Sequence, residues 1–117
     1  MKPTTYHVTT DLAAEIQVPA KGILSHTLFN DDAVKVILFG FAPDQELTAH
    51  TAPMPATIQI LSGNAEITLG TDVVQAGPGC LIHMQSQLVH GIVAKSPLLM
   101  LLTLIKAARE ESQHTAV

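Results

Sequence analysis

The stretch that decides the fold is ATIQILSGNAEITLGTDVVQ, residues 56 to 75. Its apolar residues come in short runs rich in β-branched side chains, which favour strands. The runs are separated by Ser62-Gly63-Asn64 and by Gly70-Thr71-Asp72. Glycine and asparagine tolerate the positive φ that a tight reversal of the chain requires. The stretch therefore predicts three short antiparallel strands joined by two tight hairpins.

The same pattern extends through most of the chain. Short apolar segments recur between turn signals at intervals of about ten residues, a spacing typical of a sandwich or barrel of antiparallel strands. The last segment, LLMLLTLI, is also compatible with a buried helix. We expect a single all-β domain of about ten strands. The predicted strands include residues 34–41, 56–61, 65–69, 73–75, 80–84, 88–94 and 98–105.

Composition narrows the class of protein. The chain has 117 residues, which is the size of one domain. Hydrophobic residues make up 47% but aromatic residues only 3%, so the core must be aliphatic. Charged residues reach 14%, well below the roughly 25% of an average soluble domain. Part of the surface should therefore be covered by another subunit, and we expect a homodimer.

Charge and hydropathy exclude two kinds of partner. The six Lys and Arg residues are scattered and the net charge is -4, so no basic stripe exists to bind nucleic acid. The longest apolar run is far short of the ~20 residues that span a bilayer, and the N-terminus lacks the apolar core of a signal peptide. The single cysteine, Cys80, excludes an internal disulfide and agrees with a reducing compartment. We expect a cytoplasmic protein with no membrane partner.

One histidine lies in a position that is typical of a site. His50 stands between apolar strand-like runs in LTAHTAPMPATIQILSG, residues 47 to 63. A metal needs three or more convergent donors, and two ligands at i and i+2 share one face of a strand. The residue two positions after His50 is Ala52, which offers only a methyl group. His50 is therefore a candidate site residue whose nearest neighbours do not complete a metal site.

The segment from Gly40 to Gly63 resembles the first signature of the cupins, G-x5-H-x-H-x3,4-E-x6-G. His50 falls on the first histidine and Gly63 on the final glycine. Ala52 stands in place of the second histidine and Ala56 in place of the glutamate. The opening glycine is out of register, because Gly40 lies further from His50 than the pattern allows.

A later segment resembles the second cupin signature, G-x5-P-x-G-x2-H-x3-N. Gly79 and His90 match it at the family's spacing. Gln85 replaces the proline, Gln87 the glycine and Ala94 the asparagine. The resemblance is to small single-domain cupins of the conserved-barrel type, and it covers residues 34 to 104.

This resemblance implies a double-stranded β-helix, a jelly-roll barrel whose open mouth holds the site. Such barrels often dimerise through an extra N-terminal strand. The implied organisation is N-terminal strands in residues 1–33, either exchanged with a dimer partner or packed on the barrel. The conserved barrel would follow at residues 34–105, and a short helix or tail at residues 106–117.

The cupin metal site uses four side chains, of which this sequence keeps two, His50 and His90. One hypothesis is that the metal site is lost and both histidines line a pocket together with Ala52, Ala56 and Gln59. A second hypothesis is that other side chains replace the missing donors and complete a different metal site. A third is that both histidines are wall residues without a ligand.

Replacement donors would build a different metal site from His50, His90 and His83, with Gln59 as a weaker donor. His83 must face the pocket for this site to form, and it lies on the strand face opposite Ile82 and Met84. Such a site could hold Zn, Ni, Mn or Fe. The favoured function is a small-molecule-binding barrel with a His-lined apolar pocket and a degenerate metal site. The alternative is a metal-dependent dioxygenase, isomerase or decarboxylase.

Overall fold

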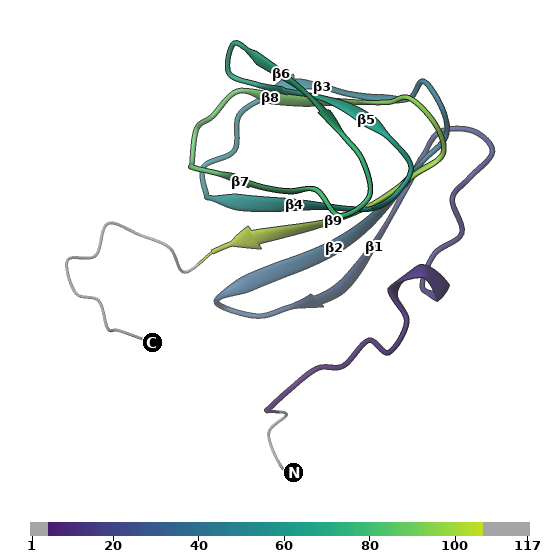
Figure 1. The fold of residues 1–117 in the computed structure, drawn as a ribbon. Helices are drawn as coiled ribbons and strands as arrows, with labels where there is room; N and C mark the ends of the chain where they lie inside the picture. Colours follow the sequence, from purple (N-terminus) through teal and green to yellow (C-terminus); the bar gives the residue numbers. More distant parts are fainter. Residues whose placement is uncertain (1–4, 107–117) are drawn as a thin grey trace.

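The computed structural model describes residues 5–106 of the chain. This part folds into two antiparallel sheets that face each other across a common core (Figure 1). The elements are a short 3-10 helix η1 (Leu12–Ala14) and the strands β1 (Ile23–Asn30), β2 (Val34–Phe41), β3 (Glu46–His50), β4 (Ala56–Ser62), β5 (Ala65–Leu69), β6 (Asp72–Ala76), β7 (Leu81–Met84), β8 (His90–Ala94) and β9 (Leu98–Ile105).

The order of the strands is that of a jelly roll. One sheet has the order β1-β2-β9-β4-β7 and the other has the order β3-β8-β5-β6. From β3 onward the chain passes repeatedly from one sheet to the other, so strands that are close in sequence lie in opposite walls of the barrel. The predicted all-β double-stranded β-helix is confirmed, with nine strands in the described residues where about ten were expected.

Only one of the two predicted hairpins is present. Gly70 and Thr71 join Leu69 to Asp72, which are register partners, and Gly70 has a φ of 65°. The prediction at Ser62-Gly63-Asn64 is wrong, because β4 and β5 belong to different sheets. That turn carries the chain across the barrel. A side chain at Gly63, whose φ is 84°, would collide with the carbonyl oxygen of Pro97, so the crossing requires glycine.

The segment LLMLLTLI forms a strand and not a helix. It is β9, which pairs with β2 on one side and β4 on the other. Three consecutive residues of β9, Leu98, Leu99 and Met100, are all buried. A continuous apolar run suits a central strand whose two faces are both covered. The N-terminal segment covers part of the outer face, where it packs against β2 so closely that a Cβ at Gly40 would lie 3.3 Å from Val18 and Pro19 atoms.

The core is aliphatic, as the composition predicts. The inner faces of β4, β5 and β8 contribute Ile58, Ile60, Ile67 and Ile92, and β2 adds Phe41. No buried polar or charged residue is found among residues 5–106. The fully apolar interior means that any chemistry must be carried by groups at the ends of the barrel.

Residues 5–33 contain one strand, β1, which pairs with β2. Exchange of this segment with a dimer partner stays a prediction. Residues 1–4 and 107–117 lie outside the described part, and with them nearly all of the predicted C-terminal helix or tail. No helix in the described residues is both long and apolar enough to pass through a membrane.

Candidate functional site

The structure brings His50 and His90 side by side. The two residues are register partners in the antiparallel pair β3–β8. Their ring centroids lie 4.4 Å apart, with an angle of 53° between the ring planes. His50 is the last residue of β3 and His90 the first residue of β8, so the pair lies at one end of the barrel. His90 is half-buried, and His50 is exposed at the rim.

Both rings belong to the inner face of the four-stranded sheet. His90 alternates with Gly91 and therefore shares its face with Ile92 and Ala94, which are core residues. Its partner on the other side is Leu69 of β5, which also packs against the core. Directly opposite residues of neighbouring strands point the same way, so His50 shares the inner face.

A β-bulge places His50 on that face. Leu47 pairs with Ile92 and His50 pairs with His90, so three steps along β3 match two steps along β8. In a regular strand, residues three apart point to opposite faces, and Leu47 already points inward. The bulge absorbs one residue of β3 and so brings His50 to the inner face as well. If all residues of β3 paired regularly with β8, His50 would lie three positions after Leu47 and its ring would point away from the barrel.

Gly91 accommodates this bulge. A Cβ at Gly91 would lie 3.1 Å from the N and Cα atoms of Ala49 and 3.2 Å from the carbonyl oxygen of Leu47. These are backbone atoms of the bulge, which cannot move aside as a flexible side chain can. Sequence reasoning missed both the bulge and Gly91. The one available signal was the glycine directly after His90.

Both histidines are held in the same tautomer. The Nδ1 atom of His50 lies 2.9 Å from the carbonyl oxygen of Thr48, and that of His90 lies 2.8 Å from the carbonyl oxygen of Leu88. A carbonyl oxygen can only accept, so each Nδ1 carries a proton and donates it. In the neutral ring the lone pair is then on Nε2. The two rings therefore present two hydrogen-bond acceptors next to each other.

The positions of the two missing cupin ligands are apolar. Ala56 opens β4 and is buried in the core, where its register partner is Met84. Ala52 is half-buried in the connection before β4, and its carbonyl oxygen accepts a hydrogen bond from the backbone of Gln87. Neither side chain can bind a metal or a polar group. Two partly buried leucines that pack on the core lie next to these positions: Leu69 is the register partner of His90, and Leu104 is the register partner of Ala56.

His83 and Gln59 do not join the histidine pair. Along β7, Ile82 and Met84 are core residues, whereas His83 between them is exposed on the outer face. Gln59 is likewise exposed between two core isoleucines of β4. The replacement-donor hypothesis required His83 to face the pair, and strand alternation turns it the other way. The prediction that Gln59 lines the pocket is also wrong, because alternation along β4 turns its side chain to the outer face.

The residues present do not fit the metal implied by the resemblance. Among residues 5–106, no group of three or more His, Cys, Asp or Glu side chains is placed to hold a metal ion. His50 and His90 supply two donors, and a catalytic zinc site has three protein ligands with an open position. The alternative of a metal-dependent dioxygenase, isomerase or decarboxylase therefore lacks its third donor in the described part of the chain.

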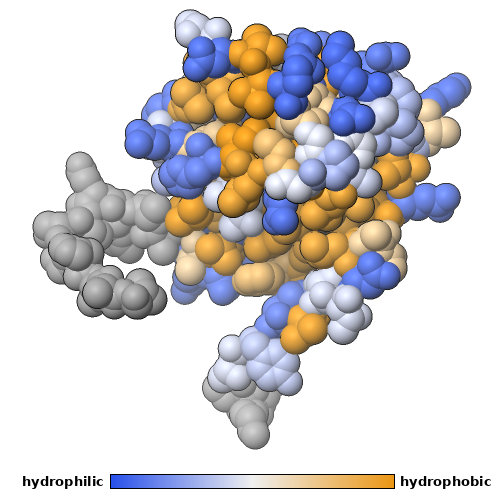
Figure 2. Space-filling model, viewed as in Figure 1, coloured by the Kyte–Doolittle hydropathy of each residue, from blue (hydrophilic) through white to orange (hydrophobic). Residues whose placement is uncertain are grey.

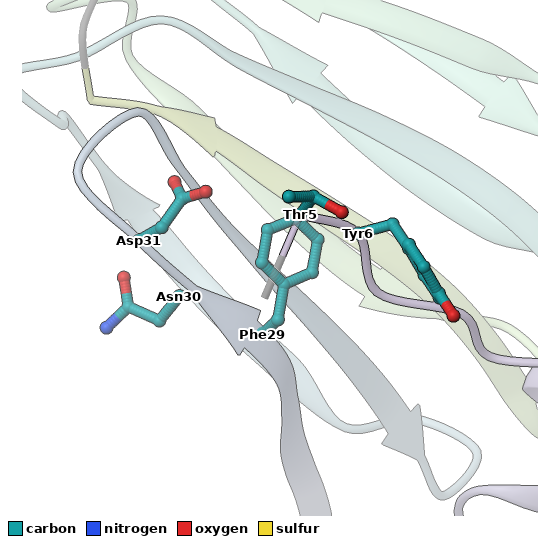
Figure 3. A pocket seen from close by; sticks show the side chains of 5 residues that line it. All are labelled: Thr5, Tyr6, Phe29, Asn30 and Asp31. Carbon is teal, nitrogen blue, oxygen red and sulfur yellow. The ribbon is translucent and has the colours of Figure 1, made fainter. Parts of the chain in front are cut away.

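A cavity lies elsewhere on the molecule. It has a volume of about 420 Å³ and is lined by Thr5, Tyr6, Phe29, Asn30 and Asp31 (Figure 3). These residues come from the N-terminal segment and from the end of β1. None of them belongs to the histidine pair, so this cavity is not the predicted His-lined pocket.

The backbone matches solved cupin structures over nearly its whole length. A cupin superfamily protein from Desulfitobacterium hafniense aligns with a TM-score of 0.76 at 23% identity, covering 88% of this chain and 93% of that chain. An RmlC-like cupin from Desulfovibrio desulfuricans aligns with a TM-score of 0.76 at 20% identity, covering 86% and 98%. The chain has the cupin fold.

A conserved protein of unknown function from Streptococcus pyogenes shares this cupin fold. It aligns with a TM-score of 0.79 at 28% identity, over 91% of this chain and 93% of that chain. No protein-family model and no curated protein matches the sequence. One barrel architecture supports many activities, so the fold does not identify the function of this protein. The histidine pair is the feature from which we infer it.

Proposed function

We propose that the protein binds a small, largely apolar molecule at the barrel end that carries His50 and His90, without a metal ion. The observation that supports this proposal most is the pairing of the two rings on the inner face of the barrel, 4.4 Å apart. Both rings are oriented by backbone carbonyls, so they are held in place before a ligand arrives. Such preorganisation lowers the entropy cost of binding.

The surroundings of the pair favour a ligand with an apolar body. Alanine occupies both positions where a cupin would carry further metal ligands, and Leu69 and Leu104, the register partners of His90 and Ala56, pack on the core beside them. Burial of apolar surface contributes roughly 25 cal/mol per Å². A few polar groups in an otherwise apolar site are the usual pattern of small-molecule recognition, and here the two imidazoles supply them.

Binding can be tested by ligand-observed NMR with a library of small aromatic and aliphatic compounds. We expect compounds that bind the full chain and that lose binding in His50→Ala and in His90→Ala. The matched control is His83→Ala, which removes the same ring from the outer face and should leave binding unchanged. Binding that persists in both His50→Ala and His90→Ala would place the ligand elsewhere and contradict the proposal.

The proposal includes a homodimer formed through the outer face of the five-stranded sheet. Leu81 is 67% exposed and Leu24 is 48% exposed on this face, and Figure 2 shows hydrophobic residues gathered on the side where β2, β4 and β9 lie. Sedimentation equilibrium should show a dimer that Leu81→Glu weakens. Val73→Glu, at a position 58% exposed on the other sheet, is the control; equal effects of the two variants would contradict this interface.

We also propose a cytoplasmic location. The single cysteine, Cys80, is free in the structure, as is usual in a reducing compartment. Fractionation of cells that produce the full chain tests this location, and recovery of the protein outside the cytoplasm would contradict it.

A further inference from the structure

We infer that the ligand of the histidine pair is a neutral hydroxyl compound, an apolar molecule whose O–H groups donate hydrogen bonds to Nε2 of His50 and Nε2 of His90. This inference rests on the proposed function and names its ligand class. Phenols and vicinal diols are the simplest members of that class.

The Nε2 atoms of His50 and His90 are the groups that remain free to bind a ligand. Each Nδ1–H is already bound to a carbonyl oxygen, of Thr48 in one ring and of Leu88 in the other. What the neutral rings offer to a ligand is therefore two lone pairs and no proton. Two lone pairs cannot satisfy each other. A ligand that covers the pair must bring donors, because an acceptor that is buried without a partner is destabilising.

The charged groups around the pair restrict the charge of the ligand. An ammonium ligand needs a carboxylate or an aromatic cage, and among residues 5–106 no Asp, Glu or Cys joins the two histidines in a group of three. A carboxylate ligand needs a cation, and two neutral rings with lone pairs would repel it. Lys35 lies on the inner face of the facing sheet, where its register partner Leu104 packs on the core, and the comparison with benzoate below tests whether this lysine attracts an anion. The pair itself therefore favours a neutral ligand.

Hydroxyl groups suit the pair better than other neutral donors do. An amide brings a carbonyl oxygen together with its N–H, and that oxygen requires a donor of its own. The ring protons of His50 and His90 are already used, and Ala52 and Ala56 have none to offer. A hydroxyl group places its donor and its oxygen at one point. A molecule with two adjacent hydroxyls can serve both Nε2 atoms at once.

The test compares phenol, catechol, benzoate and toluene, which share one ring and differ in the polar group. Affinities are measured on the full chain at pH 8.5, where histidine side chains are ordinarily neutral. Long-range ¹H–¹⁵N spectra report the state of each imidazole nitrogen. We expect phenol to bind roughly tenfold more tightly than toluene and benzoate, the value of one good hydrogen bond, and catechol more tightly still. Binding should shift the Nε2 signals of both histidines.

A variant that keeps the ring but removes the acceptor provides the control. In His50→Phe and His90→Phe, the advantage of phenol over toluene should shrink to less than about threefold, whereas His83→Phe should retain it. Toluene or benzoate binding at least as tightly as phenol would overturn the ligand class while leaving the proposed function in place. If none of the four compounds perturbs either histidine while another library compound binds the pair, the hydroxyl class is overturned and the proposed function stands; if no library compound binds the pair, the proposed function is contradicted as well.

Discussion

His50 shares the inner face of the barrel with His90 because β3 contains one residue more than β8 between their two register pairs. The ring centroids are 4.4 Å apart as a result. This relationship depends on backbone geometry and not on the histidines themselves. It can therefore be tested without changing either ring.

Deletion of Ala49 should remove the bulge. In the shortened β3, His50 would follow Leu47 by two residues, as His90 precedes Ile92 by two, so regular pairing with β8 would keep its ring on the inner face opposite His90. We expect a folded protein that retains nuclear Overhauser contacts between the rings of His50 and His90. Loss of these contacts in a folded deletion variant would contradict this account of the register.

Gly91→Ala should strain the same bulge. The new methyl group would press on backbone atoms of Ala49 at 3.1 Å, and overpacking of this kind costs about 1–3 kcal/mol of unfolding free energy. Urea denaturation measures the loss, and NMR should show altered His50 and His90 ring signals. The matched control is Gly40→Ala, whose methyl would meet Val18 and Pro19 at 3.3 Å, away from the pair. Equal changes of the histidine signals in both variants would contradict the role of Gly91.

Asp31 should make the stability of the turn between β1 and β2 dependent on pH. Its Oδ1 accepts hydrogen bonds from the backbone N–H groups of Val34, at 2.9 Å, and Ala33, at 2.8 Å. The Val34 bond and then the Ala33 bond hold the pKa of the carboxyl below its ordinary value. A lowered folded-state pKa gives stability that is present above the unfolded pKa of about 3.9 and is lost as the pH falls through the folded pKa.

Asp31→Ala should therefore lower the melting temperature at pH 7, and the difference from the unmodified chain should narrow below pH 4. Asp32→Ala, one residue further along the exposed turn, is the control and should have a smaller effect at pH 7. A difference for Asp31→Ala that stays constant from pH 7 to pH 2 would mean that the carboxylate charge is not involved.

The double variant Ala52→His with Ala56→Glu should create a metal site. These substitutions supply the two side chains that a cupin has at the matching positions, and with His50 and His90 they would give four donors. We expect about one zinc or nickel ion per chain after dialysis. A further His90→Ala change, which leaves three donors, should weaken this binding, whereas His83→Ala should leave it unchanged. A double variant that folds and binds no metal would show that the residue matches to the cupin signature are misplaced.

Local sequence was sufficient for most of the fold. The β-branched runs and the reversal at Gly70 identify β4 to β6 within a residue or two, because strand preference and turn chemistry are local properties. The turn at Ser62-Gly63-Asn64 shows the limit. The same residue types serve a hairpin and a crossing between sheets, and only the partners of β4 and β5 decide between them.

The candidate site was predicted in part. The resemblance to the cupin signatures placed His50 and His90 in one site, and the structure brings them together. Alternation along β7 separates His83 from Ile82, but one strand does not reveal which of its faces is buried. The bulge before His50 has no signature within β3, because an extra residue is defined only against the register of β8.

The most direct test of the central claim, a histidine pair that works without a metal, is the metal content of the protein. The full chain is incubated with Zn, Ni, Mn and Fe(II) in turn, dialysed, and analysed by inductively coupled plasma mass spectrometry beside His50→Ala and His90→Ala. We predict far less than one ion per chain in the unmodified protein, with no further loss in the two variants. Near-stoichiometric metal that disappears when either histidine is replaced would contradict the claim.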